Sequence, residues 1–512
     1  MNRVLAIARL TFWEGIRMRI VLVFVIVLVF VVLRLPFALR GDETLAGRLQ
    51  TFLDYSLRAL GLCMSLAIVF LSCATLTRDI QERSIHLVVT KPVSRFQILT
   101  GKWLGVNALG VLMLLLSGLV IYAFGVFIKS RPEQFVRDRL KIDDVVWTSR
   151  AAARPIEPDY TQVARERVEE LAQQGREFPT GEQAAITELA KESKEGFRQV
   201  PPGNARIYDF EGLEIPDGSA RAYQVRYKVT RIPYTGSNVI YVDWMVVHPD
   251  NRSIVEVKQT EGRSDLRHEF LLRTGIVKDG RAALGVGNPP ENGFKTIYFE
   301  GDDALEILYK VGSFEANFVK CLLLIFLRLA FLSALGIFFG TFVSFPVACF
   351  CVLFLFGLCT IQPFWLEAIG ANVQVLNAQT DPYHGWLGRI LDRAVVLAAL
   401  LILYVVCWKL DLAPPTYLGV AALVVVAVLE VLNLELGFYS GGLVRLLLTL
   451  IITYVLPNFS AYNGVPKLID GYVIPTRLML GAAGYTLGYG MLLLALPGWL
   501  IFRSREVAEL TE

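Results

Sequence analysis

Fourteen consecutive apolar residues, IVLVFVIVLVFVVL, occupy positions 20–33 and decide the class of this protein. Uniformly apolar runs of this kind are typical of membrane-spanning helices. Arginines at positions 3, 9, 17 and 19 precede the run, and by the positive-inside rule they predict a cytoplasmic N-terminus. The long leader and the lack of an A-x-A-like site after the run favour an uncleaved first span over a secretory signal peptide.

Further apolar segments follow the first span, and each approaches the roughly 20 residues that a helix needs to cross a bilayer. The candidates are 59–76, 103–127, 319–342, 345–362, 394–411, 416–435 and 479–502. A shorter run at 443–455 carries Arg445 and predicts a re-entrant or interfacial helix. Eight spans return the C-terminus to the cytoplasm, so we expect about eight spans plus this one extra helix, with 38–58 as an outer loop.

Charged residues are distributed unevenly along the chain. Of 512 residues, 54% are apolar and 19% charged, and the mean hydropathy is +0.49. Residues 129–315 carry 27 basic and 31 acidic residues (58 of the 97 charged groups), a net charge of −4. A single soluble domain and a disordered chain are therefore excluded. The pattern predicts an N-terminal membrane half (1–128), an extracytoplasmic domain (129–315) and a C-terminal membrane half (316–512). No basic stripe indicates nucleic acid as a partner.

The insert changes its pattern partway along. Residues 160–174 and 182–197 have helical periodicity, and short alternating runs rich in β-branched and aromatic residues follow, at 223–229, 239–247, 254–257 and 295–299. We expect an α+β domain, a β-sandwich with a helical lead-in. Its outer face would bind a sugar, a peptide or a partner protein, or would serve only as a structural lid or dimer contact.

Sequence signatures of catalysis are missing. The chain has neither G-x-x-x-x-G-K-[ST] nor G-x-S-x-G, and all seven cysteines lie in apolar stretches. We therefore expect no catalytic, cofactor or metal site and no enzymatic activity in this chain. If ATP and Mg²⁺ drive its work, another subunit must hold them.

Two segments next to the predicted spans stand out. Residues 4–17 form an amphipathic stretch that is expected to lie flat at the membrane interface, with Arg9, Phe12, Trp13 and Arg17 as its anchors. The loop 77–102 is predicted to be cytoplasmic. Asp79 and Glu82 have capping-box spacing and predict the start of a short helix that ends at Pro92, and a second helix leads through 101–103 into the third span.

These segments resemble the permease subunits of type-2 ABC exporters, closest to the branch associated with copper-enzyme maturation and gliding motility. The likeness covers roughly 1–128 and 317–502. Its most specific parts are RDIQERSIHL at 78–87 and KPVSRFQILTGK at 91–102, with weaker parts at 344–348 and 456–459. The family plan also has a re-entrant outer helix before the last span, which fits 443–455.

The resemblance implies a permease in the cell (inner) membrane that works with a separate ATP-binding subunit. A coupling helix of the permease docks in a groove of that subunit. It assigns the docking role to Asp79, Glu82, Arg83, Ser84, Ile85 and His86. A permease homodimer or a paired permease, and the lipid bilayer, are the other implied partners. The outer insert and an extra pair of spans at 394–435 depart from the plan. The alternative is a non-transporting anchor or receptor, whose loop at 77–102 only orients its helices and whose outer domain binds a ligand.

Two charges fall away from the ends of predicted spans, Arg328 and Glu430. Intramembrane charges mark functional sites by default, although side chains near helix ends also reach to the interface. Both are expected in the outer half of the membrane, where they could pair. The spacings Gly336-x-x-x-Gly340 and Gly484-x-x-x-Gly488 are weak signals of close helix packing.

Overall fold

The computed structural model forms two compact units, which are described separately. The first contains residues 1–142, 318–469 and 474–512, and the second contains 143–317 together with the four residues 470–473. The structure describes 2–18, 44–81, 93–130, 142–174, 181–213, 223–233, 238–248, 250–272, 280–301, 303–364, 457–493 and 497–504, with short pieces of 23–34 and residues 178, 277 and 278.

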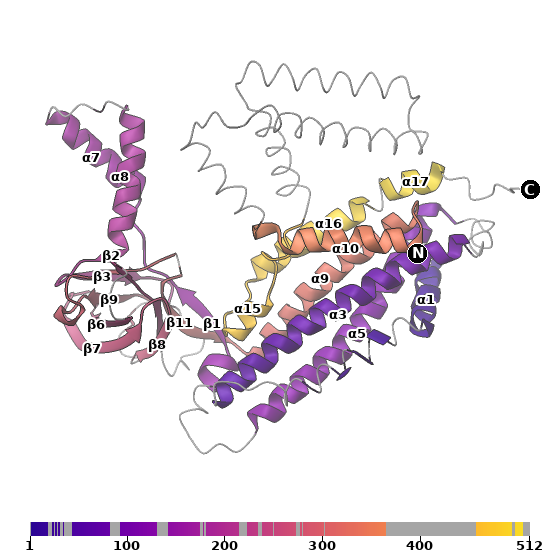
Figure 1. Cartoon of the computed structure of the whole chain (residues 1–512), viewed down its shortest axis with the longest axis horizontal. Helices are drawn as coiled ribbons and strands as arrows, with labels where there is room; N and C mark the ends of the chain where they lie inside the picture. Colours follow the sequence, from indigo (N-terminus) through magenta and orange to yellow (C-terminus); the bar gives the residue numbers. More distant parts are fainter. Residues whose placement is uncertain are drawn as a thin grey trace, which may run out of the picture. The chain divides into compact units, whose positions relative to one another are not determined.

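The first unit is helical (Figure 1). Three of its described helices, α3, α5 and α9, are long and apolar enough to cross a membrane, which marks the chain as a membrane protein with several candidate spans. The helices are α1 (Asn2–Arg17), α3 (Leu45–Gln81), α5 (Arg95–Lys129), α9 (Phe314–Gly340), α10 (Phe345–Thr360), α15 (Val465–Ile469), α16 (Thr476–Leu493) and α17 (Trp499–Ser504).

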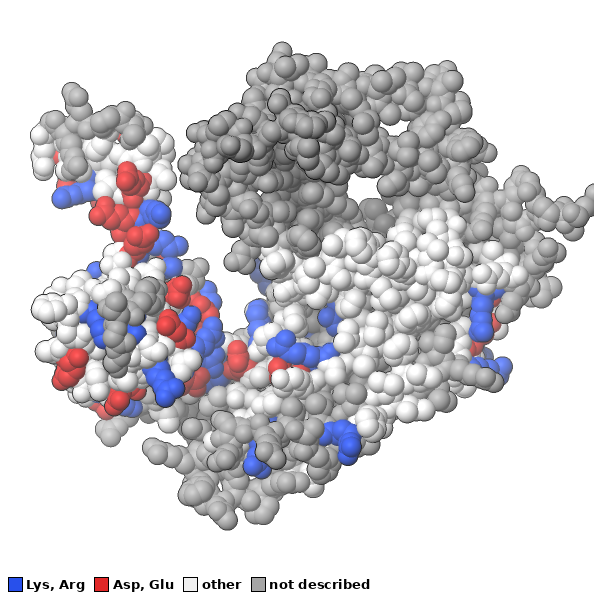
Figure 2. Space-filling view, in the orientation of Figure 1, with Lys and Arg blue, Asp and Glu red and all other residues white. Residues whose placement is uncertain are grey.

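The described surface of these helices is mostly uncharged, as Figure 2 shows. On α5 the apolar side chains Leu115 and Leu119 are 58% and 64% exposed. A contiguous exposed apolar face is unusual for a soluble helix and is what lipid contact requires. The charged side chains gather instead on the second unit and near the ends of the helices.

Helices occur at four predicted spans, 59–76, 103–127, 319–342 and 345–362, although α10 is short at 16 residues. The predicted last span, 479–502, is divided between α16 and α17. The prediction of a loop over 38–58 was wrong, because α3 begins at Leu45. Leucines four residues apart, at 45, 49, 53 and 57, form one buried stripe there. Most of 20–33, and all of 394–411, 416–435 and 443–455, lie outside the described residues.

Glycine brings two of these helices together. A Cβ at Gly336 of α9 would lie 1.9 Å from Oγ of Ser72 on α3, so only glycine permits this approach. The packing predicted for Gly336 is thereby confirmed. For Gly484 and Gly488 no described atom lies within 4 Å of the added Cβ.

The second unit is a β-rich domain of open antiparallel sheets. One sheet has the order β1 (Ser149–Ala153), β11 (Leu305–Gly312), β4 (Tyr223–Lys228) and β8 (Arg267–Leu272). Another has the order β3 (Ala205–Phe210), β9 (Ala282–Gly287), β6 (Val239–Val247) and β7 (Ile254–Arg263). A small third sheet contains β2 (Gln199–Val200), β10 (Thr296–Tyr298) and β5 (Thr230–Ile232). Two short helical elements accompany the sheets, a π-helix η1 (Ile142–Val146) and a 3₁₀ helix η4 (Pro290–Asn292).

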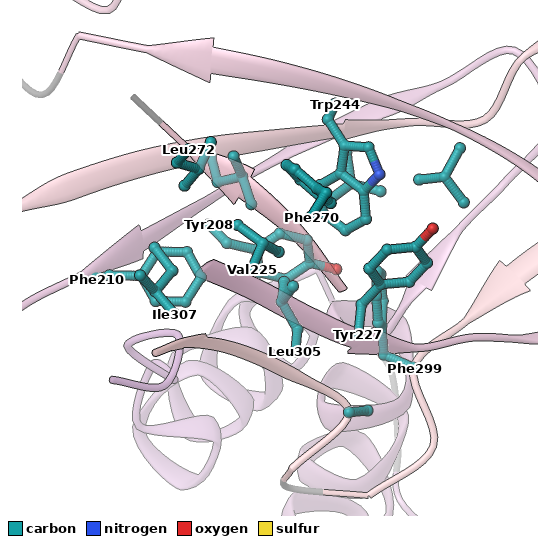
Figure 3. Packing of buried hydrophobic residues seen from close by; sticks show 14 of the residues in the cluster. Tyr208, Phe210, Val225, Tyr227, Trp244, Phe270, Leu272, Phe299, Leu305 and Ile307 are labelled. Carbon is teal, nitrogen blue, oxygen red and sulfur yellow. The ribbon is translucent and has the colours of Figure 1, made fainter. Parts of the chain in front are cut away.

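Side chains from both four-stranded sheets form one core (Figure 3). Trp244 of β6 lies 5.0 Å from the Phe270 ring of β8 and 4.7 Å from the Tyr227 ring of β4. The Trp244 indole and the Tyr227 hydroxyl both bond to Thr260 Oγ1 at 2.8 Å, which satisfies their polar atoms inside the core. Aromatic side chains on facing sheets therefore hold the two layers together.

The helical lead-in is confirmed as α7 (Tyr160–Gln173) and α8 (Glu182–Phe197), and the four predicted β runs contain β4, β6, the start of β7 and β10. Asp159 caps α7 by accepting bonds from the N–H groups of residues 161 and 162. In Figure 1 the pair α7–α8 extends away from the sheets of this unit.

Residues 470–473, between α15 and α16, pair with β1 and are called the strap here. Arg150 N–H donates to Gly471 O at 2.7 Å, and Val473 N–H donates to Arg150 O at 2.7 Å, which makes a parallel bridge. Gly471 has φ +69°, and a Cβ there would lie 2.2 Å from Val145 O. Only glycine fits this position.

Buried charges fix the strap to the sheet β1-β11-β4-β8. Arg150 donates to Gln224 Oε1 and, at 2.7 Å, to Asp470 O, while burial lowers the pKa of its guanidinium to about 10. The Arg226 guanidinium lies 4.8 Å from the Tyr472 ring centre. The Tyr472 hydroxyl donates to Glu306, and burial, followed by this bond, raises the pKa of Tyr472 to about 12. The hydroxyl therefore stays protonated and can donate to Glu306.

Candidate functional site

The N-terminal helix α1 packs against the beginning of α5. A Cβ at Gly101 would lie 2.8 Å from the Ile7 side chain, and one at Gly105 would lie 2.5 Å from Ala8 O. The spacing Gly101-x-x-x-Gly105 thus creates a groove in which the α1 backbone lies. Gly15 of α1 meets Leu109 of α5 in the same way, at 2.6 Å.

The opposite face of α1 carries the residues predicted to anchor it. Arg9, Trp13 and Arg17 are exposed, and Phe12 is half-buried. The Phe12 and Trp13 rings are 5.8 Å apart at 84°, an edge-to-face contact. Leu5 and Leu10 are also exposed. One face of α1 therefore packs on protein, and the other combines arginines with large apolar groups, the composition of an interfacial helix.

Lys102, which is 4% exposed on α5, connects the ends of two long helices. Its Nζ lies 2.5 Å from Asp79 Oδ2 and donates to Thr75 O at 3.0 Å, both on α3. The prediction that Asp79 starts a new helix was wrong, because α3 continues through Asp79 to Gln81. Leaving a buried lysine without a carboxylate costs more free energy than leaving a helix start without a cap. Asp79 therefore pairs with Lys102 and lies in the last turn of α3.

The start of α5 is fixed from several sides. Ser94 caps it, and the Ser94 and Gln97 side chains form a reciprocal capping box. About two turns further along, Trp103 Nε1 donates to Ala330 O of α9 at 3.0 Å, and Asn107 Nδ2 donates to Ser333 Oγ at 2.9 Å. The first three turns of α5 are thus bonded to α3 and α9 and packed on α1.

The chain between Gln81 and Arg95 joins these two fixed helix ends. Glu82, Arg83, Ser84, Ile85 and His86, the other predicted docking residues, lie in this connection and outside the described residues. Asp79 is the one member of the predicted set that the structure describes. It lies at the junction of α1, α3 and α5, called the junction below, from which the connection leaves.

Arg328 lies near the middle of α9, beside a small cavity. The cavity measures about 20 Å³ and is bounded by α9, the 459–464 segment and α16, including Arg328, Tyr462, Asn463 and Thr486. The Arg328 guanidinium lies 5.9 Å from the ring centre of Phe356 on α10. Glu430, the predicted partner of Arg328, lies outside the described residues.

Sequence reasoning missed three features of these sites. Lys102 and the Gly101/Gly105 groove have a visible signal, a lysine and two glycines at the polar end of an apolar run. The strap has none, because nothing in DGYV at 470–473 marks a segment that will pair with residues more than 300 positions earlier. Long-range pairing of four residues leaves no periodicity in the sequence.

Within the described ranges, no group of three His, Cys, Asp or Glu side chains could hold a metal ion. The junction offers a fixed mechanical connection between helices, and the Arg328 cavity offers a positive charge. No known protein family, curated protein or solved structure matches this chain in the comparisons made.

Proposed function

We propose that this chain is the membrane subunit of an ABC-type transporter, driven by a separate ATP-binding subunit that contacts the connection between α3 and α5. The observation that carries the proposal is the junction, because it fixes the ends of two candidate spans on either side of that connection. ATP and Mg²⁺ would be bound by the partner.

The junction suggests how a push on the connection would spread. When the connection between Gln81 and Arg95 is displaced, it pulls or pushes on the last turn of α3 and on the capped start of α5. The Lys102–Asp79 pair resists separation of these two helix ends, and Trp103 and Asn107 extend the bonded network to α9. Three candidate spans would then tilt together, with α1 at the interface as a fourth member of the same body.

The proposal includes the finer topology expected from the sequence. In this topology the chain has eight spans and a re-entrant helix at 443–455, and both termini lie in the cytoplasm. The β-rich domain, a sandwich, lies on the outer side of the inner membrane. It also includes a second permease, identical or paired. The exposed apolar surface of α5 and the interfacial composition of α1 support membrane placement.

Reversing one charge in the connection is expected to weaken capture of the ATP-binding subunit. Glu82→Lys would place a like or unpaired charge in the partner's groove, where such a change typically costs several kcal/mol. The measurement is pull-down of the ATP-binding subunit at matched membrane levels of the permease. Glu169→Lys, on the exposed surface of α7, is the control and should capture as the natural chain does. Equal capture by all three chains would remove Glu82 from the contact.

The β-rich domain is expected to lie on the opposite side of the membrane from the two ends of the chain. In a cysteine-free variant, single cysteines at Ser253, an exposed residue of the β-rich domain, and at Ser504 after the last apolar segment report the two sides. An impermeant thiol reagent added to intact cells should modify the first site and spare the second. The reverse pattern would end this topology. A correct topology without any captured ATP-binding subunit would favour the anchor or receptor alternative.

A further inference from the structure

The longest described strand of the β-rich domain, β7, lies at the edge of a sheet. It has ten residues and ends the order β3-β9-β6-β7, which can be followed in Figure 1. Among the described strands, β6 is the one that pairs with β7. The second edge of β7 therefore carries backbone N–H and C=O groups that can bond to a further strand. Sheets usually keep such edges short, so an edge strand of this length is expected to have a partner.

The side chains of β7 are accessible in the full chain. Every residue of the strand is exposed or half-buried. Ile254, Val255 and Val257 are 57%, 61% and 62% exposed, so three β-branched side chains within four positions leave apolar surface in water. A strand added at this edge would remove part of that surface from water, which favours association.

Two charged side chains of β7 restrict which strand can be added. Glu256 is paired with Val246 of β6, and Lys258 is paired with Trp244. Both partners belong to the core, so both charges lie on the core-facing side of the sheet. The Lys258 ammonium lies 4.9 Å from the ring centre of Phe270 in that core. A core-facing charge at an edge opposes strand pairing unless the incoming strand places an opposite charge beside it.

A second copy of β7 meets this requirement. When two copies pair antiparallel about a two-fold axis at Val257, Glu256 of each copy is directly opposite Lys258 of the other. The arrangement makes two ion pairs and places Val257 opposite the same residue of the second copy. Because both copies use the same surface, the contact closes as a dimer and leaves neither of the two edges open.

Other axes match the charges less well. An axis at Lys258 places this lysine opposite itself, and an axis at Gln259 places it opposite Thr260. An axis at Gly262 would pair Glu261 with Arg263, but β7 ends at Arg263, so few residues would be joined. The axis at Val257 is the one that pairs both core-facing charges.

We infer that the second edge of β7 is a contact between two copies of this chain, paired antiparallel about Val257. The inference rests on the proposed function for its second permease, and it makes that permease an identical chain. The contact includes no residue of the connection between α3 and α5, so it is tested without an ATP-binding subunit.

Disulfide cross-linking of the full chain in membranes tests the pairing at Val257. In a cysteine-free variant, Val257→Cys should give a disulfide-linked dimer under mild oxidation, because directly opposite residues have Cβ atoms about 4.5–5.5 Å apart. Ile207→Cys is the matched control and should give little dimer. Ile207 is 43% exposed and lies in the same row across the sheet, through Gly285 and Met245, but on the opposite edge strand, β3.

Charge reversal tests the two ion pairs. Glu256→Lys and Lys258→Glu, each added alone to Val257→Cys, should lower the yield of dimer on the order of tenfold, because two opposite-charge pairs become like-charge pairs. The two reversals together restore opposite charges across the axis and should restore the dimer. Recovery in the double reversal also shows that the reversed residues do not prevent folding.

Absence of a dimer in Val257→Cys would overturn the inference. So would an equal yield from Ile207→Cys, which would indicate random collision, or a double reversal that does not recover. Co-purification of two differently tagged copies without a cross-link at Val257 would keep the second permease and remove β7 from the contact. A Val257→Cys dimer in a chain that captures no ATP-binding subunit would support the contact and contradict the proposed function alone.

Discussion

Replacing Asp79 with alanine is expected to destabilise the junction by about 3 kcal/mol. The change leaves Lys102 Nζ, on a side chain that is 5% exposed, with Thr75 O as its remaining partner. Removing one member of a buried ion pair costs roughly 3–5 kcal/mol, and the lower end applies because the Asp79 side chain is 23% exposed. Hydrogen exchange at the first turns of α5 should then rise about 100-fold, since each 1.4 kcal/mol is a factor of ten.

A double-mutant cycle separates the pair from other effects of the change. Lys102→Met keeps the volume and removes the charge, so combining it with Asp79→Ala should restore most of the lost protection. Arg58→Ala, which breaks an exposed pair with Asp54 on the same helix, is the control and should change exchange little. If the double variant were as unstable as Asp79→Ala alone, the ion pair would not be what holds α3 to α5.

Gly471→Val is expected to detach the strap from β1, at a cost of about 3 kcal/mol. A β-branched residue at φ +69° brings about 1–2 kcal/mol of backbone strain. The added Cβ would also lie 2.2 Å from Val145 O, so the strap must shift and lose its two backbone bonds to Arg150, each worth about 1 kcal/mol. Hydrogen exchange at the N–H groups of Arg150 and Val473 reports the loss directly.

Gly203→Val is the matched control for that experiment. Gly203 has φ +73°, close to the value at Gly471, but no atom of the described residues lies within 4 Å of its added Cβ. It therefore carries the backbone strain without the steric contact and should leave exchange at Arg150 and Val473 unchanged. Protected amides at both positions in Gly471→Val would mean that the strap tolerates a side chain and that its bonds do not depend on glycine.

Local patterns in the sequence predict much of this fold. The periodicity of 160–174 and 182–197 is sufficient to predict α7 and α8, because a charged surface and a narrow apolar stripe fit no other structure. Composition likewise identifies the apolar helices. The start of α3 was missed because Arg48, Asp54 and Arg58 dilute the apolar content there, although the leucine stripe opposite them is regular.

The sites are harder to predict, because they depend on which elements become neighbours. Asp79 has the spacing of a helix cap, yet it pairs with Lys102, 23 positions later. Arg328 is conspicuous in the sequence as a charge within an apolar run, but six of the ten residues that line its cavity lie more than 130 positions away. In the β-rich domain, Arg150 and Arg226 contact the strap, which lies more than 240 positions later in the sequence.

The strap also fixes when the β-rich domain can be completed. Asn317 ends the continuous part of the domain, and Asp470 is made 153 residues later, which takes about 8–30 s at 5–20 residues per second. During that interval Arg150, Arg226 and Glu306 lack the partners that Asp470 and Tyr472 provide. The β-rich domain therefore cannot be completed until synthesis of the chain has passed Val473.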